Sequence, residues 1–380
     1  TCNPNFPQGR LYPGYRNRLR QSEDIEGVRV VRVWSLITPN DRTLTRMLAF
    51  FSFMISSFLA AFFEPRPDIV TSTSPQFFCA VGAWAHAMMR RLPYVFELGD
   101  LWPASITALG AMAPNLFLRL MEKFELFLYR RADAVIALTA DFKRDLISRG
   151  IRPDKIVVIR NGVDLTHYAP RPRNEALAAE WGLKEKFIVA YIGTHGLAHA
   201  LDRVLDAAQR LEKRSPEIAF LFVGDGAKRK ELNTRKEKDC LTNVVLTGAR
   251  PKVEMPDWWS LADLALVSLR NIPLFTGVIP SKIFEAMGMG VPILFFGPVG
   301  EASGIVEDAG CGLLVPAEDA QALAEAVLQV AQDPKAMQRL RARCVEAAPS
   351  YSRAEQARHT LEVYRGVLEG HYREIKEALA

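Results

Sequence analysis

The stretch "FIVAYIGTHGLAHALDRVL", residues 187–205, joins an apolar strand-like run to an amphipathic helical run through a turn that holds two glycines. Gly193 and Gly196 stand between the two runs, where backbone N–H groups can approach an anion at the N-terminus of the following helix. A glycine at a strand-to-helix turn is often required by the turn alone. The stretch therefore predicts one βα unit, with an anion site as one possible use of its turn.

Strand-like and helical runs alternate along the whole chain, which is typical of parallel sheets built from βαβ units. We expect strands over residues 28–34, 69–73, 94–98, 134–138, 156–160, 187–192, 219–223, 244–246, 264–268, 293–296 and 312–315. The polar, proline-bearing segment 161–183 separates the two series and reads as a linker. The sequence thus predicts two doubly wound, Rossmann-like α/β domains, 1–165 and 166–380, facing across a cleft, with ligands outside the carboxyl ends of the strands.

The composition indicates a folded globular protein, because 49% of its 380 residues are hydrophobic and 24% are charged. Five cysteines, none in a CxxC pair, predict reduced thiols in a cytosolic protein and no zinc site. The net charge of +5 is held in the first half, where 21 Lys and Arg up to residue 165 face 15 Asp and Glu. This excess suits a solvated surface or an anionic partner, such as a membrane, a lipid-linked phosphate or nucleic acid.

Residues 47–63, "MLAFFSFMISSFLAAFF", form the most apolar run of the chain. They are fewer than the roughly 20 residues that a transmembrane helix needs. Ser52, Ser56 and Ser57 fall on one side at helical spacing. A partly exposed helix of the domain and a helix lying in the membrane surface both remain open, and a true span is the least favoured of the three.

Two further glycine turns and one helix start complete the candidate site. The turns contain Gly224, Gly226 and Lys228, then Gly248 and Arg250, and the helix start "PSKIFEAMGMG" contains Ser281, Lys282 and Glu285. Ser281 suits a helix N-cap and Glu285 suits the first turn, so neither requires a function. Lys282 does not fit this view, because a cation in the first turn is unfavourable by a few tenths of a kcal/mol unless an anion binds there.

Other nucleotide sites are disfavoured by missing motifs. The chain has no GxGxxG followed by an acidic residue about 20 positions later, and no GxxxxGK[ST]. It also has no Asp-x-Asp pair that would hold a divalent metal on a diphosphate. The charge of a diphosphate would then be met by helix dipoles, lysine and histidine.

The second half resembles the nucleotide-sugar domain of the retaining glycosyltransferases of family 4, which have the two-domain GT-B fold. The matching stretches are "IRNGVDLTHYAP", "GTHG", "VGDG", "LTGARP", "PSKIFEAMGMGVPIL" and "GEASGIVEDAGCGLLVPAEDAQALAEAV". Through "PNFPQG", "GVRVVRVW" and "LGDLWPASITALG", the first half is similar to the branch that builds bacterial O-antigen, capsule and exopolysaccharide with N-acetylamino sugars on a lipid-diphosphate carrier.

The resemblance implies roles for particular residues. Glu285 stands at the second position of the family's Glu-x7-Glu pattern, which holds the ribose, while the first position is Gly277. Thr194 and His199 stand where many members have an arginine and a lysine, so Lys282 becomes the expected diphosphate contact. The family's first strand and glycine-rich loop would precede Thr1, and its last helix crosses back to the first domain.

The implied reaction moves a sugar, by resemblance an N-acetylamino sugar, from a UDP-sugar to an acceptor with retained configuration and without a metal or other cofactor. Stabilisation of the leaving diphosphate is assigned to the turn Gly193, Thr194, Gly196, to Lys282 and to His195. Asp100 could orient the acceptor or serve as a turn residue. The expected partners are a UDP-sugar, a lipid-diphosphate-linked acceptor and the inner face of the cell membrane, with no nucleic acid.

Three other functions fit parts of the sequence. A UDP-sugar epimerase of the same fold would use no acceptor and needs no membrane, which the 47–63 run and the basic first half disfavour. A non-catalytic, nucleotide-binding partner subunit would explain Gly277 and the absent N-terminal loop. A nicotinamide-dependent dehydrogenase is disfavoured by the missing fingerprint.

Overall fold

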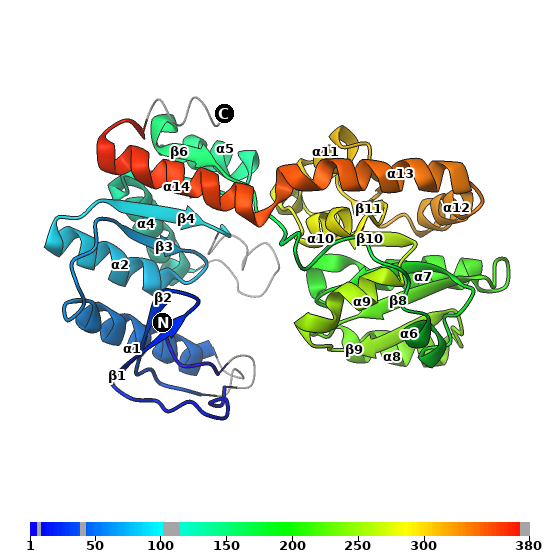
Figure 1. Ribbon diagram of the computed structural model, residues 1–380, viewed down its shortest axis with the longest axis horizontal. Helices are drawn as coiled ribbons and strands as arrows, with labels where there is room; N and C mark the ends of the chain where they lie inside the picture. Colours follow the sequence, from blue (N-terminus) through cyan, green and yellow to red (C-terminus); the bar gives the residue numbers. More distant parts are fainter. Residues whose placement is uncertain (6–8, 39–42, 102–114, 373–380) are drawn as a thin grey trace. The chain divides into compact units, whose positions relative to one another are not determined.

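The computed structural model describes residues 1–5, 9–38, 43–101 and 115–372. Its contacts divide the chain into two compact units, each with its own sheet (Figure 1). Unit 1 comprises Thr1–Leu138, Phe142–Ile159 and Thr360–Ala380. Unit 2 comprises Thr139–Asp141 and Arg160–His359. The main change of unit therefore falls at Arg160, shortly before the expected boundary after residue 165.

Unit 2 contains a six-stranded sheet in the order β12-β11-β10-β7-β8-β9, in which every neighbouring pair is parallel. The expected strands of this half are confirmed to within two residues: β7 Phe187–Ile192, β8 Ile218–Val223, β9 Val244–Gly248, β10 Leu264–Ser268, β11 Ile293–Gly297 and β12 Gly312–Pro316. The chain builds outward from β7 to β9, then returns to the other side of β7 and builds outward again. The β7–β10 pair is therefore the topological switch point, where ligands of open α/β sheets bind.

Helices cover both faces of this sheet. One face packs on the apolar sides of α7 Leu201–Glu212, α8 Arg229–Lys238 and α12 Ala320–Ala331. The other packs on α9 Met255–Ser260, α10 Lys282–Met289 and α11 Glu301–Asp308, with α6 Glu175–Glu180 beside them. Residues of α13 Pro334–Ala347 contribute to both clusters. Burial on both faces explains why β7, β8, β10 and β11 are continuous apolar runs.

Unit 1 contains a four-stranded parallel sheet in the order β3-β4-β5-β6. Its strands are β3 Val70–Thr73, β4 Tyr94–Leu98, β5 Ala134–Ala137 and β6 Ile156–Val158, close to the expected ranges. Its described helices include α1 Thr43–Ala61, α2 Phe77–Arg90, α4 Leu116–Arg131 and all but the first two residues of α5 Ala140–Ser148.

The expected first strand, residues 28–34, does not join this parallel sheet. It forms β2 Val28–Val33, which pairs antiparallel with β1 Arg20–Ile25 in a separate hairpin. The two turn residues, Glu26 and Gly27, both have positive φ, of 53° and 80°, which is the geometry that joins a tight hairpin. Strand β1 is not among the expected strands, because "RQSEDI" is polar and lacks apolar alternation.

Helix α1 contains most of the apolar run 47–63, up to Ala61, and packs on α2. Met54 of α1 lies 3.3 Å from the position that a Cβ on Gly82 of α2 would take. Its outer side exposes Leu48, Phe51, Ile55 and Leu59, spaced three or four residues apart. Across the described residues, no helix combines the length and apolar character needed to cross a membrane.

Short 3₁₀ turns connect several elements: η1 Pro153–Lys155, η2 Leu197–His199, η3 Lys252–Glu254, η4 Pro273–Gly277 and η5 Ala348–Tyr351. Helix α14 Arg353–Glu369 begins in unit 2 and ends in unit 1 (red in Figure 1). Its later residues join the unit 1 core, where Val363 is fully buried and Tyr364 donates a hydrogen bond to Glu97 of β4.

Candidate functional site

A cavity of about 520 Å³ lies at the carboxyl edge of the unit 2 sheet. Residues from the turns after β7, β8 and β9 and from the start of α10 line it. Among the predicted site residues, those that line it are Gly193, Thr194, Gly224, Arg250, Ser281, Lys282 and Glu285. Most of the predicted residues thus lie in one cavity at the topological switch point of the sheet.

The turns after β7 and β8 touch backbone to backbone. A Cβ on Gly224, whose φ is +140°, would lie 2.0 Å from the carbonyl oxygen of Gly193. A Cβ on Gly226 would lie 2.6 Å from the carbonyl oxygen of His195. These glycines are therefore required by close packing, and this packing fixes the inner wall of the cavity.

Lys282 is the first residue of α10 and lies at the inner end of the cavity. Its side chain is buried, with 8% of the residue exposed, and its Nζ has no hydrogen-bond partner among the described residues. The ammonium lies 3.5 Å from the centre of the Tyr191 ring, which attracts a cation through its face. Burial lowers the pKa of Lys282 to about 7, partly offset by the nearby charge of Glu285.

Gly193 is also needed beside this lysine. Its φ is +144°, and a Cβ there would lie 3.0 Å from Nζ of Lys282. The glycine therefore leaves the ammonium room to reach the turn after β7. This close approach links the first candidate turn to the helix start.

Glu285 lies one turn further along α10 and is held by an indole. Nε1 of Trp259 donates a hydrogen bond to its Oε2 at 3.2 Å. Ser281 takes the N-cap position, but its φ and ψ of −58° and −25° are helical and its side chain makes no capping bond. The role of Ser281 as a side-chain cap is thus wrong, and the residue is exposed at the cavity instead.

The two histidines of the turn after β7 differ in position. His199 lines the cavity, and its Nδ1 lies 3.1 Å from the carbonyl oxygen of Ser268. His195 does not line it: the residue is fully buried, and both ring nitrogens lack partners within the part of the chain that the structure describes. Burial, followed by the charge of Lys282, lowers the pKa of each histidine to about 4.

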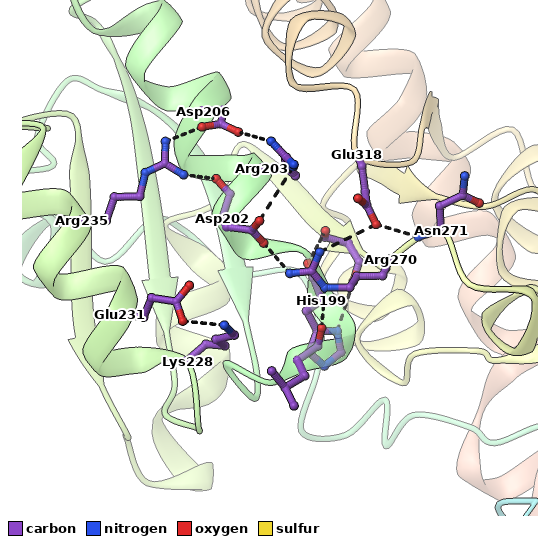
Figure 2. Close-up of polar contacts among 12 residues, drawn as sticks. His199, Asp202, Arg203, Asp206, Lys228, Glu231, Arg235, Arg270, Asn271 and Glu318 are labelled. Carbon is purple, nitrogen blue, oxygen red and sulfur yellow. Dashed lines mark hydrogen bonds and ion pairs between the residues drawn. The ribbon is translucent and has the colours of Figure 1, made fainter. Parts of the chain in front are cut away.

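A polar network holds the His199 turn against the end of β10 (Figure 2). Arg270 donates its backbone N–H to the carbonyl of Ala198 and its Nε to the carbonyl of Leu197, both at 2.8 Å. Its Nη2 also bonds Asp202 of α7 at 2.8 Å. Because three of its groups are used, Arg270 fixes the turn that presents His199.

The remaining predicted residues lie in different places. Arg250 lines the cavity, with its guanidinium over the rings of Trp181 and Trp258. Lys228 pairs with Glu231 and does not line the cavity (Figure 2). Gly196 is the N-cap of η2, and it does not line the cavity either.

Asp100 belongs to unit 1 and follows β4. Its backbone N–H donates to Oγ of Ser74, which in turn donates to its carbonyl. The rest of the "LWPASITALG" stretch, from Trp102, falls outside the described residues. A larger cavity of unit 1, about 610 Å³, is lined mainly by residues 1–5, 32–38 and 46–53, and none of the predicted site residues line it.

Sequence reasoning assigned no role to Tyr191, Trp259 or Tyr168, and it named His199 only as a departure from the family. Tyr191 is the one aromatic with a hydroxyl in an otherwise apolar strand, which was the available signal. The predicted absence of a metal stays a prediction. In the described ranges, no group of three or more His, Cys, Asp or Glu side chains is placed to hold one.

Replacing Lys282 by methionine should stabilise the fold, because it removes a buried charge without a partner. The unfolded lysine has a pKa near ~10.4, and burial lowers the folded pKa to about 7. Between these values the unfolded state binds more protons, so wild-type stability rises with pH through this window. The gain from Lys282→Met should therefore be largest at or below neutral pH and smaller in alkali.

Urea unfolding of both proteins at acid and alkaline pH measures this gain. Lys238→Met, on an exposed lysine of α8, is the control and should show no such pH dependence. A Lys282→Met protein that is less stable than wild type at acid pH would contradict the description of Lys282 as unpaired.

Two family models match the chain. One, described as a glycosyl transferase 4-like domain, matches residues 9–162, and the other, described as glycosyl transferases group 1, matches residues 186–333. WbjE of Pseudomonas aeruginosa, named as a glycosyltransferase, is 26% identical over 244 residues, 63% of this chain and 60% of WbjE. WcaI of Escherichia coli, whose name assigns it to colanic acid biosynthesis, is 24% identical, over 76% of this chain and 72% of WcaI.

The chain thus spans less than two thirds of the length of WbjE. Among solved structures, Anabaena HepE in complex with UDP and glucose is similar with a TM-score of 0.69 and 19% identity, over 86% of this chain and 84% of HepE. This likeness shows a shared fold, the GT-B fold of two Rossmann-like domains. With the two family models matching successive parts that together span most of the sequence, the chain belongs to the group 1 glycosyltransferases with a family 4-like first domain.

Proposed function

We propose that the protein transfers a sugar from a UDP-sugar to an acceptor hydroxyl, with retained configuration, in the synthesis of a bacterial surface polysaccharide. The observation that carries this proposal is the buried Lys282, whose unpaired Nζ lies at the inner end of a cavity at the switch point of the unit 2 sheet. A buried amine without a partner is unfavourable for stability, and an anionic ligand supplies the missing interaction.

The nucleoside end of the donor suits Glu285. A carboxylate accepts hydrogen bonds from two neighbouring ribose hydroxyls, and Trp259 fixes this carboxylate from behind. The diphosphate suits the region of Lys282 and the start of α10, because the N-terminus of a helix attracts negative charge. HepE, which has the same fold, was solved with UDP and glucose, which supports a UDP donor.

The chemistry then needs mainly stabilisation of the leaving diphosphate. Retaining hydrolases place two carboxylates ~5 Å apart, one of them a nucleophile. Two carboxylates line this cavity, Asp225 and Glu285, and Glu285 is already held by Trp259 in the place that suits the ribose. We therefore favour attack of the acceptor on the face that the diphosphate leaves, with the diphosphate taking the acceptor proton. Negative charge grows on the diphosphate as the bond breaks, so Lys282 and the turn at Gly193 act in the transition state.

The finer parts of the proposal rest on the resemblance of the first half. We propose an N-acetylamino sugar as the transferred group, a lipid-diphosphate-linked acceptor, metal-independent reaction and association with the inner face of the cell membrane. The name of WcaI, which places that protein in colanic acid biosynthesis, supports the polysaccharide pathway class.

Transfer should be detected when the protein is incubated with a panel of UDP-sugars and a lipid-diphosphate-sugar acceptor, with the product read by mass. A chelator should leave the rate unchanged, because helix dipoles and Lys282 replace a metal. Loss of transfer on chelation would contradict metal independence. Turnover of the donor without any acceptor product would favour an epimerase or a hydrolase instead.

Membrane binding should be peripheral and depend on both salt and the exposed side of α1. High salt should release part of the protein from anionic vesicles, because it screens the basic half. Ile55→Glu, on the outer side of α1, should weaken vesicle binding, whereas Ile147→Glu on α5, of similar exposure, should not. A protein that fails to bind at low salt would show that α1 is only a domain helix.

Glu285 and Lys282 should differ in kinetics. The ribose looks the same in the bound donor and the transition state, so Glu285→Gln should cost ~1–3 kcal/mol, mostly as a higher KM. Lys282→Ala should lower kcat, by ~2–4 kcal/mol, because it removes a contact that strengthens as charge develops. Single-turnover kinetics at saturating donor separates the two effects, with Lys238→Ala as the control.

An unchanged chemical rate in Lys282→Ala at saturation would mean that this lysine is only a cation in the first turn of a helix.

A further inference from the structure

Three basic side chains gather around the Tyr191 ring, and two of them, Lys282 and His195, lack hydrogen-bond partners within the described ranges. Nζ of Lys282 lies 3.5 Å from the ring centre, and the rings of His195 and His199 lie 5.9 and 5.8 Å from it. Neither Nζ of Lys282 nor either nitrogen of His195 has a hydrogen-bond partner within the described ranges. The Tyr191 ring is therefore surrounded by groups that can accept a proton, of which Lys282 and His199 line the cavity.

The hydrogen bond of His199 fixes where its proton lies. The carbonyl oxygen of Ser268 only accepts, so Nδ1 of His199 must carry the hydrogen (Figure 2). In the neutral ring Nε2 then has a lone pair and no hydrogen, and it can give nothing to a phosphate oxygen. Near neutral pH, His199 is thus not a substitute for a fixed cation.

The charge of Lys282 is also adjustable. Burial lowers its pKa to about 7, so a large part of the free protein carries a neutral amine above this pH. A diphosphate beside Nζ would favour the charged form and raise this pKa again. Titratable and charged groups from several elements surround the lysine. Those on β7 or in the turn after it are Tyr191, His195 and His199. The others are Asp225 and Arg229 after β8, Arg250 and Lys252 after β9, Glu285 on α10, and Tyr168.

Of these groups, Arg250 stays charged in both states and cannot follow the ligand. Asp225 accepts a hydrogen bond from the backbone N–H of Gly226, which lowers its pKa, so this carboxylate stays ionised near neutral pH. His195 does not line the cavity. We therefore expect that a bound diphosphate changes the protonation of Lys282 more than that of any other group around the cavity.

We propose that binding of a nucleoside diphosphate to this cavity takes up one proton from solvent, and that Lys282 holds it against the phosphate oxygens. The amine –NH₂ becomes –NH₃⁺, the proton comes from water or buffer acid, and no bond of the ligand forms or breaks. The inference rests on the proposed function for the identity of the ligand, but it concerns binding alone and needs no sugar transfer.

Titration calorimetry with UDP in two non-phosphate buffers of different ionisation enthalpy tests this proposal. The dependence of the measured heat on buffer gives the number of protons taken up. We expect about half a proton near pH 7 and about one near pH 8.5, where the terminal phosphate of UDP is already ionised. Uridine, which has no phosphate, should cause no uptake.

Two variants test which residue takes up the proton when UDP binds. Lys282→Arg keeps a cation that does not lose its proton, so it should bind UDP without uptake, whereas His199→Gln should keep the uptake. Uptake that survives in Lys282→Arg and vanishes in His199→Gln would overturn the assignment to Lys282. Thermal melting confirms that each variant is folded.

The wild-type protein alone gives a second measurement. Its UDP affinity should fall about tenfold per pH unit in the alkaline range, because each bound ligand carries a proton with it. UDP binding with no buffer dependence and no fall with pH would overturn this inference and leave the proposed function standing. A protein that does not bind UDP at all would overturn both.

Discussion

The pairing of β10 with β7 determines where the functional groups of unit 2 lie. Leu264 and Ala265 pair with Val189 and Ala190, so the chain returns to its first strand after having built outward from it. The turn after β7 and the segment after β10 then diverge at the same edge of the sheet. Arg270 spans the two by binding the carbonyls of Leu197 and Ala198, and α10 starts beside them. The cavity is a consequence of this topology.

The same constraint explains why an unfavourable residue is kept in a well-packed region. Ile283, Phe284 and Met287 of α10 are almost fully buried and anchor the helix on the sheet. Because α10 is anchored in this way, its first residue, Lys282, stays at the inner end of the cavity although burial opposes its charge. The packing energy of the helix thus supports a lysine whose own contribution to stability is negative, as is common for groups that act on a ligand.

The sequence predicted the elements that have a clear hydrophobic pattern, and it missed features that depend on turn geometry or on contacts between distant side chains. Long apolar strands such as β7 and β10 were found because both faces are buried, whereas the polar β1 was missed because turn geometry, not apolar alternation, creates its hairpin. Lys282 was found because a cation in the first turn of a helix is unfavourable, whereas the role of Glu285 came from the resemblance to the family's Glu-x7-Glu pattern. His195 was named for the diphosphate, but the structure buries it, and His199 lines the cavity instead. The contacts that hold the His199 turn come from Ser268 and Arg270, which are too distant in the sequence for a local pattern to reveal. Lys228 pairs with Glu231 and does not line the cavity, which the spacing of the residues could not predict.

Many family members have an arginine and a lysine where this chain has Thr194 and His199, and this difference affects the release of product in the proposed reaction. The donor has a diphosphate diester, and the released UDP has one more negative charge. A site with permanent positive charge would bind this product more tightly than the donor and slow its release. In the proposed binding step, Lys282 on the ring of Tyr191 gains positive charge as the ligand binds, beside a histidine whose Nε2 lacks a hydrogen. Since the amine can return its proton to solvent as UDP leaves, the free site regains the neutral form that burial favours. The low-polarity surroundings that make Lys282 unfavourable in the free protein are therefore the same ones that let its charge follow the ligand.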